Sequence, residues 1–196
     1  MTSRGYAVDH VVIAVPELDV ATARLDEQHG LTALEGGRHR GWGTANRIVP
    51  LGSCYLELVT VVDEAEAASS VFGRWVTDLL DGAEVMGWAA RTPDIRADAA
   101  RLGVEVVAGA RTSRTGARLT WRLAGVERAA ADPATPFLIE WGEGTSLPGA
   151  AAVEHRSGPD AHLVELVVRA DAAALAHWLG ADELPVASAR PVPRGV

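Results

Sequence analysis

Two glutamates inside apolar runs are the residues of this sequence whose surroundings most need a chemical explanation. Glu57 lies in "CYLELV", residues 54–59, and Glu140 lies in "PFLIEWG", residues 136–142. A carboxylate among apolar side chains must face water, pair with a positive charge or bind a cation. Arg47, Arg118 and Arg122 lie on neighbouring predicted strands, so an ion pair and a cation site both stay open for these glutamates.

A glycine-rich stretch before Glu57 carries a second group of reactive or recognition side chains. The stretch reads "GGRHRGWGTAN", residues 36–46, and contains His39, Trp42 and Asn46. These residues offer a titratable ring, an aromatic plane and an amide, which suit ligand binding on a loop held by a scaffold. A plain structural turn is the alternative, because glycines also permit tight connections. We predict that His39, Trp42 and Asn46 bind a substrate.

The elements that must position these side chains recur along the chain. A strand, an Asp at a helix start, a helix and a terminal Gly occur three times in this order. The start and stop residues are Asp19 and Gly30, then Asp94 and Gly103, then Asp171 and Gly180. In the first two repeats, further strands follow the helix, including a strand between two glycines and a second strand after it, and we read each repeat as β-α-β-β-β.

This repetition gives one domain with two similar halves. Module one covers residues 6–62, a linking helix covers 63–81, and module two covers 84–143. A partial third βα unit covers 150–182 and a Pro-rich tail covers 185–196. A chain of 196 residues suits one sizeable core better than two independent domains.

Strand alternation predicts which side chains meet. His10 shares a face with Val12 and Ala14, and the other face of that strand suits packing under a helix. His10 therefore points toward the enclosed side, where Glu57 and Glu140 would join it if they face the same way. Trp121 is predicted to line the same enclosed space. Trp88 and Trp141 are predicted to pack under helices.

Composition excludes several classes of partner. The chain has 18 basic residues, all Arg, against 26 acidic ones, giving a net charge of −8. No basic block suits nucleic acid or anionic membranes. A single Cys, no signal-peptide pattern and no apolar run of about 20 residues indicate a cytoplasmic protein. The use of Arg alone indicates a GC-rich, bacterial source. No Gly-x-Ser-x-Gly elbow or phosphate-binding loop occurs, which argues against hydrolase and nucleotide-binding functions.

Three stretches carry a resemblance to a known family: "DHVVIAVPELD", "GGRHRGWGTANRIVPLGSCYLELV" and "FLIEW". Across most of residues 6–180, the chain resembles the glyoxalase-like domain family of the vicinal oxygen chelate (glyoxalase/bleomycin resistance/dioxygenase) superfamily. The resemblance implies an α+β fold, in which paired βαβββ modules form a curved, cup-like mixed sheet with helices on the outer face. The partial third βα unit would be an addition to this plan.

The resemblance also implies a metal site in the cup. Metal-dependent members take their ligands from the first and last strands of each module, which here correspond to His10, Glu57 and Glu140. The fourth position falls on Gly87, which has no side chain to offer. A divalent Zn, Ni, Mn or Fe ion would then be held by three ligands, with Glu140 or Glu57 moving a proton.

Two functions follow from this resemblance. The first is an enzyme acting on a small oxygenated or carbonyl metabolite, by lyase, isomerase or dioxygenase chemistry. The second is a metal-free protein that binds or sequesters a small molecule or drug, which Gly87 favours. The superfamily hosts both on one scaffold. The sequence leaves both a monomer and a homodimer open.

Overall fold

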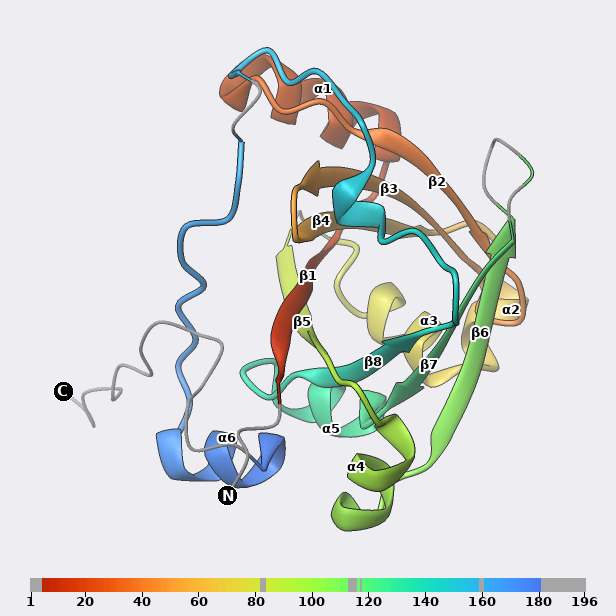
Figure 1. Cartoon of the computed structure of the whole chain (residues 1–196). Helices are drawn as coiled ribbons and strands as arrows, with labels where there is room; N and C mark the ends of the chain where they lie inside the picture. The colour runs from red at the N-terminus through yellow and green to blue at the C-terminus, as the bar shows by residue number, and fades with distance from the viewer. Residues whose placement is uncertain (1–4, 82–83, 113–115, 117, 159–160, 181–196) are drawn as a thin grey trace, which may run out of the picture.

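The computed structural model describes residues 5–81, 84–112, 116, 118–158 and 161–180, and is built around one curved eight-stranded sheet (Figure 1). Module one contributes β1 (Ala7–Ala14), α1 (Leu18–His29), β2 (Leu34–His39), β3 (Thr44–Leu51) and β4 (Cys54–Val61). Module two contributes β5 (Glu84–Arg91), α4 (Ile95–Leu102), β6 (Val106–Thr112), β7 (Arg118–Ala124), α5 (Val126–Ala131) and β8 (Phe137–Trp141). Helix α5, between the last two strands, was not predicted.

The strand order is β2-β3-β4-β1-β5-β8-β7-β6, so the first strands of both modules pair at the centre. The β1–β5 pairing is antiparallel, whereas β1–β4 and β5–β8 are parallel. The sheet curves until its end strands approach each other, and the Arg111 guanidinium on β6 donates a hydrogen bond to the Gly36 carbonyl on β2. We call this contact between the end strands the seam. The predicted α+β fold with a cup-like mixed sheet is confirmed.

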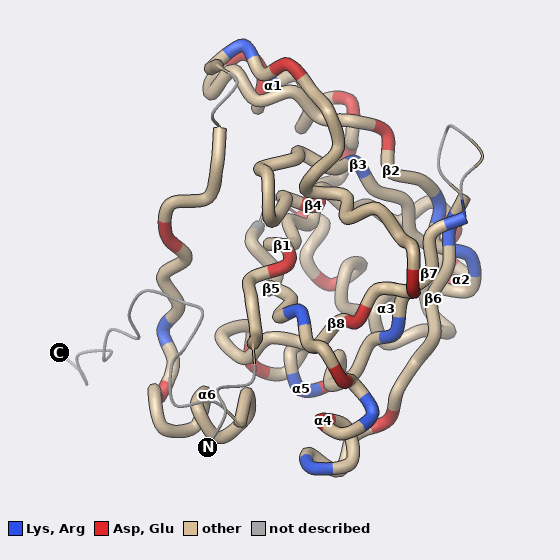
Figure 2. Tube along the Cα trace, in the orientation of Figure 1, with Lys and Arg blue, Asp and Glu red and all other residues tan. Residues whose placement is uncertain are grey.

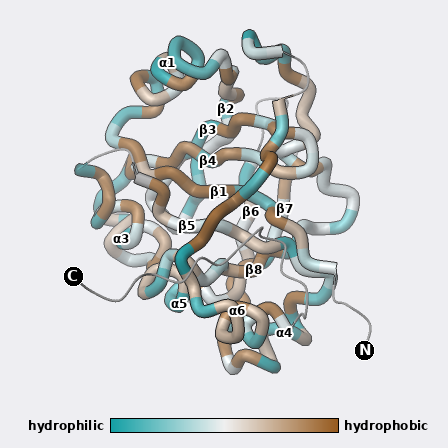
Figure 3. The backbone as a smooth tube through the Cα atoms, turned by 90° about the vertical axis from the view of Figure 1, so that its left-hand side faces the viewer, coloured by the Kyte–Doolittle hydropathy of each residue, from teal (hydrophilic) through white to brown (hydrophobic). Residues whose placement is uncertain are grey.

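Helices α4 and α6 (Ala172–Leu179) cover the outer face of module two, and α1 lies over module one. Trp88 packs there with Ile95 of α4 and Leu175 of α6, as predicted. Strands β1 and β4 carry long hydrophobic stretches in Figure 3. Charged residues of both signs are interspersed along the tube in Figure 2. Within the described ranges, every helix is too short or too polar to cross a bilayer.

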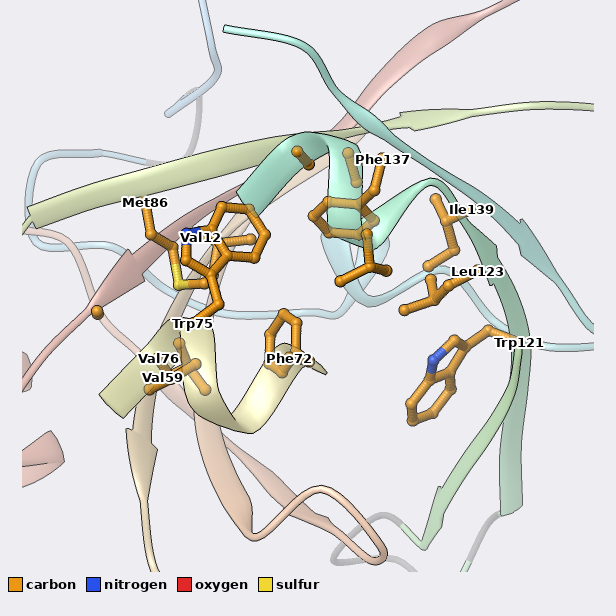
Figure 4. Close-up of a cluster of buried hydrophobic side chains, with 14 residues drawn as sticks. Val12, Val59, Phe72, Trp75, Val76, Met86, Trp121, Leu123, Phe137 and Ile139 are labelled. Carbon is orange, nitrogen blue, oxygen red and sulfur yellow. The ribbon is translucent and has the colours of Figure 1, made fainter. Parts of the chain in front are cut away.

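The segment between the modules enters the cup, contrary to the expectation that helices lie only outside. It forms two helices, α2 (Glu64–Ala68) and α3 (Val71–Thr77), because Asp63 and Ser70 each cap a new helix start. Phe72 and Trp75 of α3 point toward the inner side chains of the strands, including Val12 (Figure 4). The single linking helix predicted for 63–81 is therefore wrong, and α3 closes part of the interior.

The predicted third unit forms its helix but not its strand. Asp171 caps α6 by accepting from the Ala174 N–H, and Gly180 ends the helix in the left-handed conformation. Residues 161–170 form no strand beyond a bridge at Val168. The central strands β1 and β5 are already paired on both edges, so this extended segment can only pack across the outer face. The predicted tail, 185–196, lies outside the described residues.

Helix stops were predicted more accurately than starts. Gly30 and Gly103 end α1 and α4 in the left-handed conformation, and Asp94 caps α4 as expected. The predicted N-cap at Asp19 is wrong, since α1 begins at Leu18. Asp19 lies in the first turn and pairs with Arg47 instead.

Candidate functional site

A small cavity inside the cup gathers most of the predicted site residues. Its volume is ≈ 30 Å³, which is room for one or two water molecules. Module one lines it with four polar residues, His10, His39, Asn46 and Glu57, and module two contributes Arg111 and Trp121. Trp42 also reaches the cavity wall. The structure thus brings together every predicted site residue except Glu140.

Glu57 is the acidic centre of this cavity. It lies on β4 with only 5 % of its surface exposed. Its Oε1 accepts a hydrogen bond from the Asn46 amide at 2.5 Å. The Nε2 of His10 lies 3.4 Å from Oε2, and the Nε2 of His39 lies 3.8 Å from Oε1. Two imidazoles and an amide therefore surround one buried carboxylate.

His10 is held by its neighbour in the chain, Asp9. In the β1–β5 ladder Val8 pairs with Ala90 and His10 with Ala89, so Asp9 is the extra residue of a β-bulge. The bulge turns both side chains to the inner face, and Asp9 Oδ1 lies 2.8 Å from His10 Nδ1. An ionised Asp9 places a proton on Nδ1 and leaves the Nε2 lone pair facing Glu57.

Further contacts fix this pair. Asp9 Oδ2 accepts a hydrogen bond from the Trp141 indole at 3.0 Å, and the Arg91 guanidinium lies 3.5 Å away. The His10 ring stacks on Tyr55 with a centroid separation of 4.6 Å. Both ring nitrogens of His10 are therefore assigned to defined neighbours, and the ring plane is fixed.

His39 ends β2 and is buried among aromatic rings. Its ring contacts those of Trp42, Phe72 and Trp121. Burial lowers the pKa of His39, and the nearby Glu57 carboxylate offsets only part of this effect, so the ring is neutral at pH 7. Its Nδ1 lies 3.0 Å from the Thr44 hydroxyl. When that hydroxyl donates to Nδ1, the proton of His39 lies on Nε2, toward Glu57.

Glu140 lies on the other face of the sheet, and the prediction that it meets His10 and Glu57 is wrong. The β7–β8 register pairs Trp121 with Trp141 and Arg122 with Glu140. Trp121 and Trp141 line the cavity, whereas Glu140 forms an ion pair with Arg122 at 2.5 Å. The ion pair considered as the alternative for Glu140 is confirmed, and the prediction that Trp141 packs under helices is wrong.

The physical reason is the different connection in the second module. Helix α5 lengthens the connection from β7 to β8. The positions of β8 that point into the cup therefore differ from those expected by aligning the two repeats. The pairing equivalent to Ile48 with Glu57 is therefore Trp121 with Trp141. A tryptophan takes the place at which the repeat suggested a carboxylate.

The residues present do not fit the divalent ion that the resemblance implies. A Cβ added at Gly87 would lie 2.7 Å from the ring of Trp75, so that ring fills the fourth position. Arg111 brings a positive charge into the cavity. Within the described ranges, no group of three or more His, Cys, Asp and Glu is arranged to hold a metal ion.

Several contributors to the site were not predicted, among them Asp9, Tyr55, Phe72, Arg111 and Trp141. Asp9 was missed because regular alternation turns it away from His10, and a bulge has no clear sequence signal here. Phe72 was missed because the linking segment was expected outside the cup. Arg111 was missed because the strand that carries it, β6, was not identified in the sequence.

Comparisons with known proteins agree with this architecture. A family model described as Glyoxalase-like domain matches residues 8–183. A hypothetical protein from Staphylococcus aureus has a similar structure, with a TM-score of 0.58, 21% identity, and coverage of 74% of this chain and 62% of that one. The chain thus spans less than two thirds of that relative. Among curated proteins, none matches the chain.

Methylmalonyl-CoA epimerases are also similar in structure. A Streptomyces coelicolor variant in complex with 2-nitronate-propionyl-CoA has a TM-score of 0.52, 20% identity, and coverage of 74% and 99% of the two chains. An epimerase in complex with methylmalonyl-CoA and NH4+ has a TM-score of 0.51, 19% identity, and coverage of 76% and 100%. At these identities the likeness shows the fold. Because the family model spans nearly the whole sequence, the chain belongs to the glyoxalase-like domain family.

Proposed function

We propose that this protein is an enzyme that moves a proton at a carbon next to a carbonyl group of a small metabolite bound in the cup. The observation that carries the proposal is the buried carboxylate of Glu57, which faces the Nε2 of His10 at 3.4 Å while Asp9 holds the Nδ1. A base, an acid partner and a group that orients the acid are the parts that general acid–base catalysis requires.

Each residue has a defined part in this reaction. Glu57 removes the proton with Oε2, because Oε1 is engaged by Asn46. His10 takes the proton from Glu57 on its Nε2, and Asp9 stabilises the imidazolium that forms. The imidazolium can then return a proton to the other face of the carbanion. The neutral His39 donates from Nε2 to the enolate oxygen. The aromatic wall keeps water away and strengthens these interactions.

The chain's own residues carry this scheme without a metal step. The donor set is incomplete, because Glu140 is paired with Arg122 and Gly87 is covered by Trp75. We therefore expect activity to survive treatment with a chelator, and purified protein to lack stoichiometric metal. The chelator and metal measurements are independent of the Glu57→Gln experiment, which tests the base.

A second cavity offers space for the rest of a longer substrate. It has a volume of ≈ 200 Å³, and Trp42, Phe72 and Leu123 line both cavities. Movement of these side chains would join the two spaces. Because the solved epimerases of this fold are named for a coenzyme A ester, acyl thioesters are sensible first substrates beside small ketones.

Exchange of carbon-bound protons with solvent tests the proposed reaction. In D2O, the wild-type protein should catalyse deuterium incorporation next to the carbonyl of a small ketone or thioester, followed by NMR. Glu57→Gln should slow the exchange by about 100-fold or more, because the base is lost. The matched control is Glu140→Gln, which changes a glutamate on the outer face and should keep the wild-type rate. Equal exchange rates for wild type and Glu57→Gln would exclude Glu57 as the base.

The incomplete donor set also supports a second candidate, a metal-free binding protein. A binder would shift its melting temperature with a ligand and show no exchange on any ligand that it binds. Measuring both quantities on the same compounds separates the two functions.

A further inference from the structure

Arg111 is a buried cation that the proton-transfer scheme does not use. It lies on β6, lines the cavity with Glu57 and His10, and has only 8 % of its surface exposed. Across the described part of the chain, no carboxylate oxygen lies within 4.0 Å of its guanidinium nitrogens. The other cavity charge, Glu57, is engaged by Asn46, His10 and His39.

Most of the hydrogen-bonding capacity of Arg111 is also unused. A guanidinium carries five N–H donors in a fixed fork. The described residues accept one hydrogen bond from it, the bond from Nη1 to the Gly36 carbonyl at the seam. Burial lowers the pKa of Arg111, and Tyr55 and Glu57 act in the opposite direction. Arginine nevertheless stays charged at neutral pH, so a positive charge faces the cavity.

Closing the seam does not explain this charge. A single bond to a backbone carbonyl needs one neutral donor, such as a glutamine amide, and burying a cation with no carboxylate in direct contact costs free energy. The cost is recovered when an anion enters the cavity. Arginine is suited to this role because its fork matches the two oxygens of a carboxylate.

We propose that Arg111 binds the carboxylate group of a small anionic substrate, so that the proton transfer proposed above takes place on a small carboxylic acid. The inference rests on that proposed function for the reaction, but anion binding itself requires only Arg111 and the cavity. The ≈ 30 Å³ cavity has room for only one or two water molecules, so a small carboxylic acid would enter as Trp42 and Phe72, which also line the neighbouring ≈ 200 Å³ cavity, move aside. The carboxylate would lie in the same cavity as Glu57 and His10.

Titration with matched charged and neutral probes tests this site. Trp42, Trp121 and Trp141 line the cavity, so intrinsic fluorescence reports its occupation. Glycolate and acetate should bind the wild-type protein about tenfold or more tightly than glycolamide and acetamide, because hydrogen bonds to a charged group are the stronger ones.

Two arginine variants locate the effect. Arg111→Gln should weaken glycolate binding by about tenfold or more and leave glycolamide unchanged, since the charge and the fork are both lost. Arg122→Gln is the control, because Arg122 lies on the outer face and pairs with Glu140. It should bind glycolate as the wild type does. If Arg111→Gln fails to fold, the preference of the wild type for glycolate over glycolamide decides the question.

Three results would overturn the inference: no glycolate binding up to the solubility limit, equal affinity for glycolate and glycolamide, or wild-type glycolate binding by a folded Arg111→Gln. Glu57→Gln separates this inference from the proposed reaction. It should keep or strengthen glycolate binding, because a repelling charge is removed, even where it abolishes proton exchange. An anion site without exchange would leave this inference standing and remove the enzymatic function.

Discussion

Asp9 and His10 are adjacent in the chain, and in a regular strand their side chains would point to opposite faces of the sheet. One extra residue in the β1–β5 ladder brings both into the cup. The result is a histidine whose two nitrogens have different partners, Asp9 on Nδ1 and Glu57 on Nε2. A local irregularity of the backbone thus produces the acid partner of the site.

His39 gives the site a measurable pH dependence of stability. Burial lowers its pKa in the folded state, so below the unfolded value of about 6.5 the unfolded chain binds the proton more tightly. The contribution of His39 to stability should therefore be fully present above about pH 7. It should be lost as the pH falls below the unfolded pKa of about 6.5 toward the lower pKa of the folded state. His39→Gln should remove this part of the dependence.

Melting temperatures between about pH 7.5 and pH 5 would check this prediction. The control is His29→Gln, because His29 is exposed at the end of α1. A His39→Gln variant that loses as much stability on acidification as the His29→Gln variant would contradict the proposed role of burial.

At the scale of elements, much of the fold could be predicted because its signals are local. Gly30 and Gly103 end helices through their own backbone conformation, and alternation in β1 places Val12 inside correctly. The orientation of β8 depends on its register with two other strands and on the inserted α5, neither of which the residues of β8 specify. Glu140 was misplaced for that reason.

The position of α3 could not be read from the linking segment either, because its apolar residues suit an outer or an inner face equally. Gly87 and Trp75 show why it lies inside. The strand offers a position without a side chain, and the indole ring occupies it. Gly87, which suggested a missing metal ligand, therefore also makes room for the Trp75 ring.

Gly87→Ala tests this packing. The added methyl would lie 2.7 Å from the Trp75 ring, and Trp75 is itself held in the inner cluster. Overpacking should lower the free energy of unfolding by about 1–3 kcal/mol, measured by urea denaturation. In a background of Trp75→Leu, which frees the space, the same change should cost much less. An equal cost in both backgrounds would show that Gly87 is required for another reason.

At the scale of the whole molecule, the two modules are joined in three ways. The first strands β1 and β5 share a ladder, and the inner cluster mixes Val12 and Val59 of module one with Met86 and Phe137 of module two. The C-terminal segment then runs over the outer face of both. Its His155 accepts from the Thr32 N–H at 3.0 Å and donates to the Pro50 carbonyl at 2.7 Å, which fixes a neutral ring.

The same segment is attached to module two by its helix. Trp178 of α6 donates to the Pro136 carbonyl at 2.8 Å, and Arg101 of α4 donates to the carbonyls of His177 and Trp178. Neither module could open without breaking the central ladder, the inner cluster or this segment. The site lies where the modules meet, so its geometry depends on all three.

We therefore expect a single cooperative unfolding transition, with calorimetry, circular dichroism and tryptophan fluorescence giving the same midpoint. His155→Ala should lower the stability of this whole transition by about 1–3 kcal/mol, because it leaves the Thr32 N–H and the Pro50 carbonyl without their partner. His177→Ala should have little effect, since the exposed side chain is removed and its backbone carbonyl still accepts from Arg101. Two resolved transitions, in either the wild type or His155→Ala, would mean that the modules fold separately and that the shared ladder does not couple them.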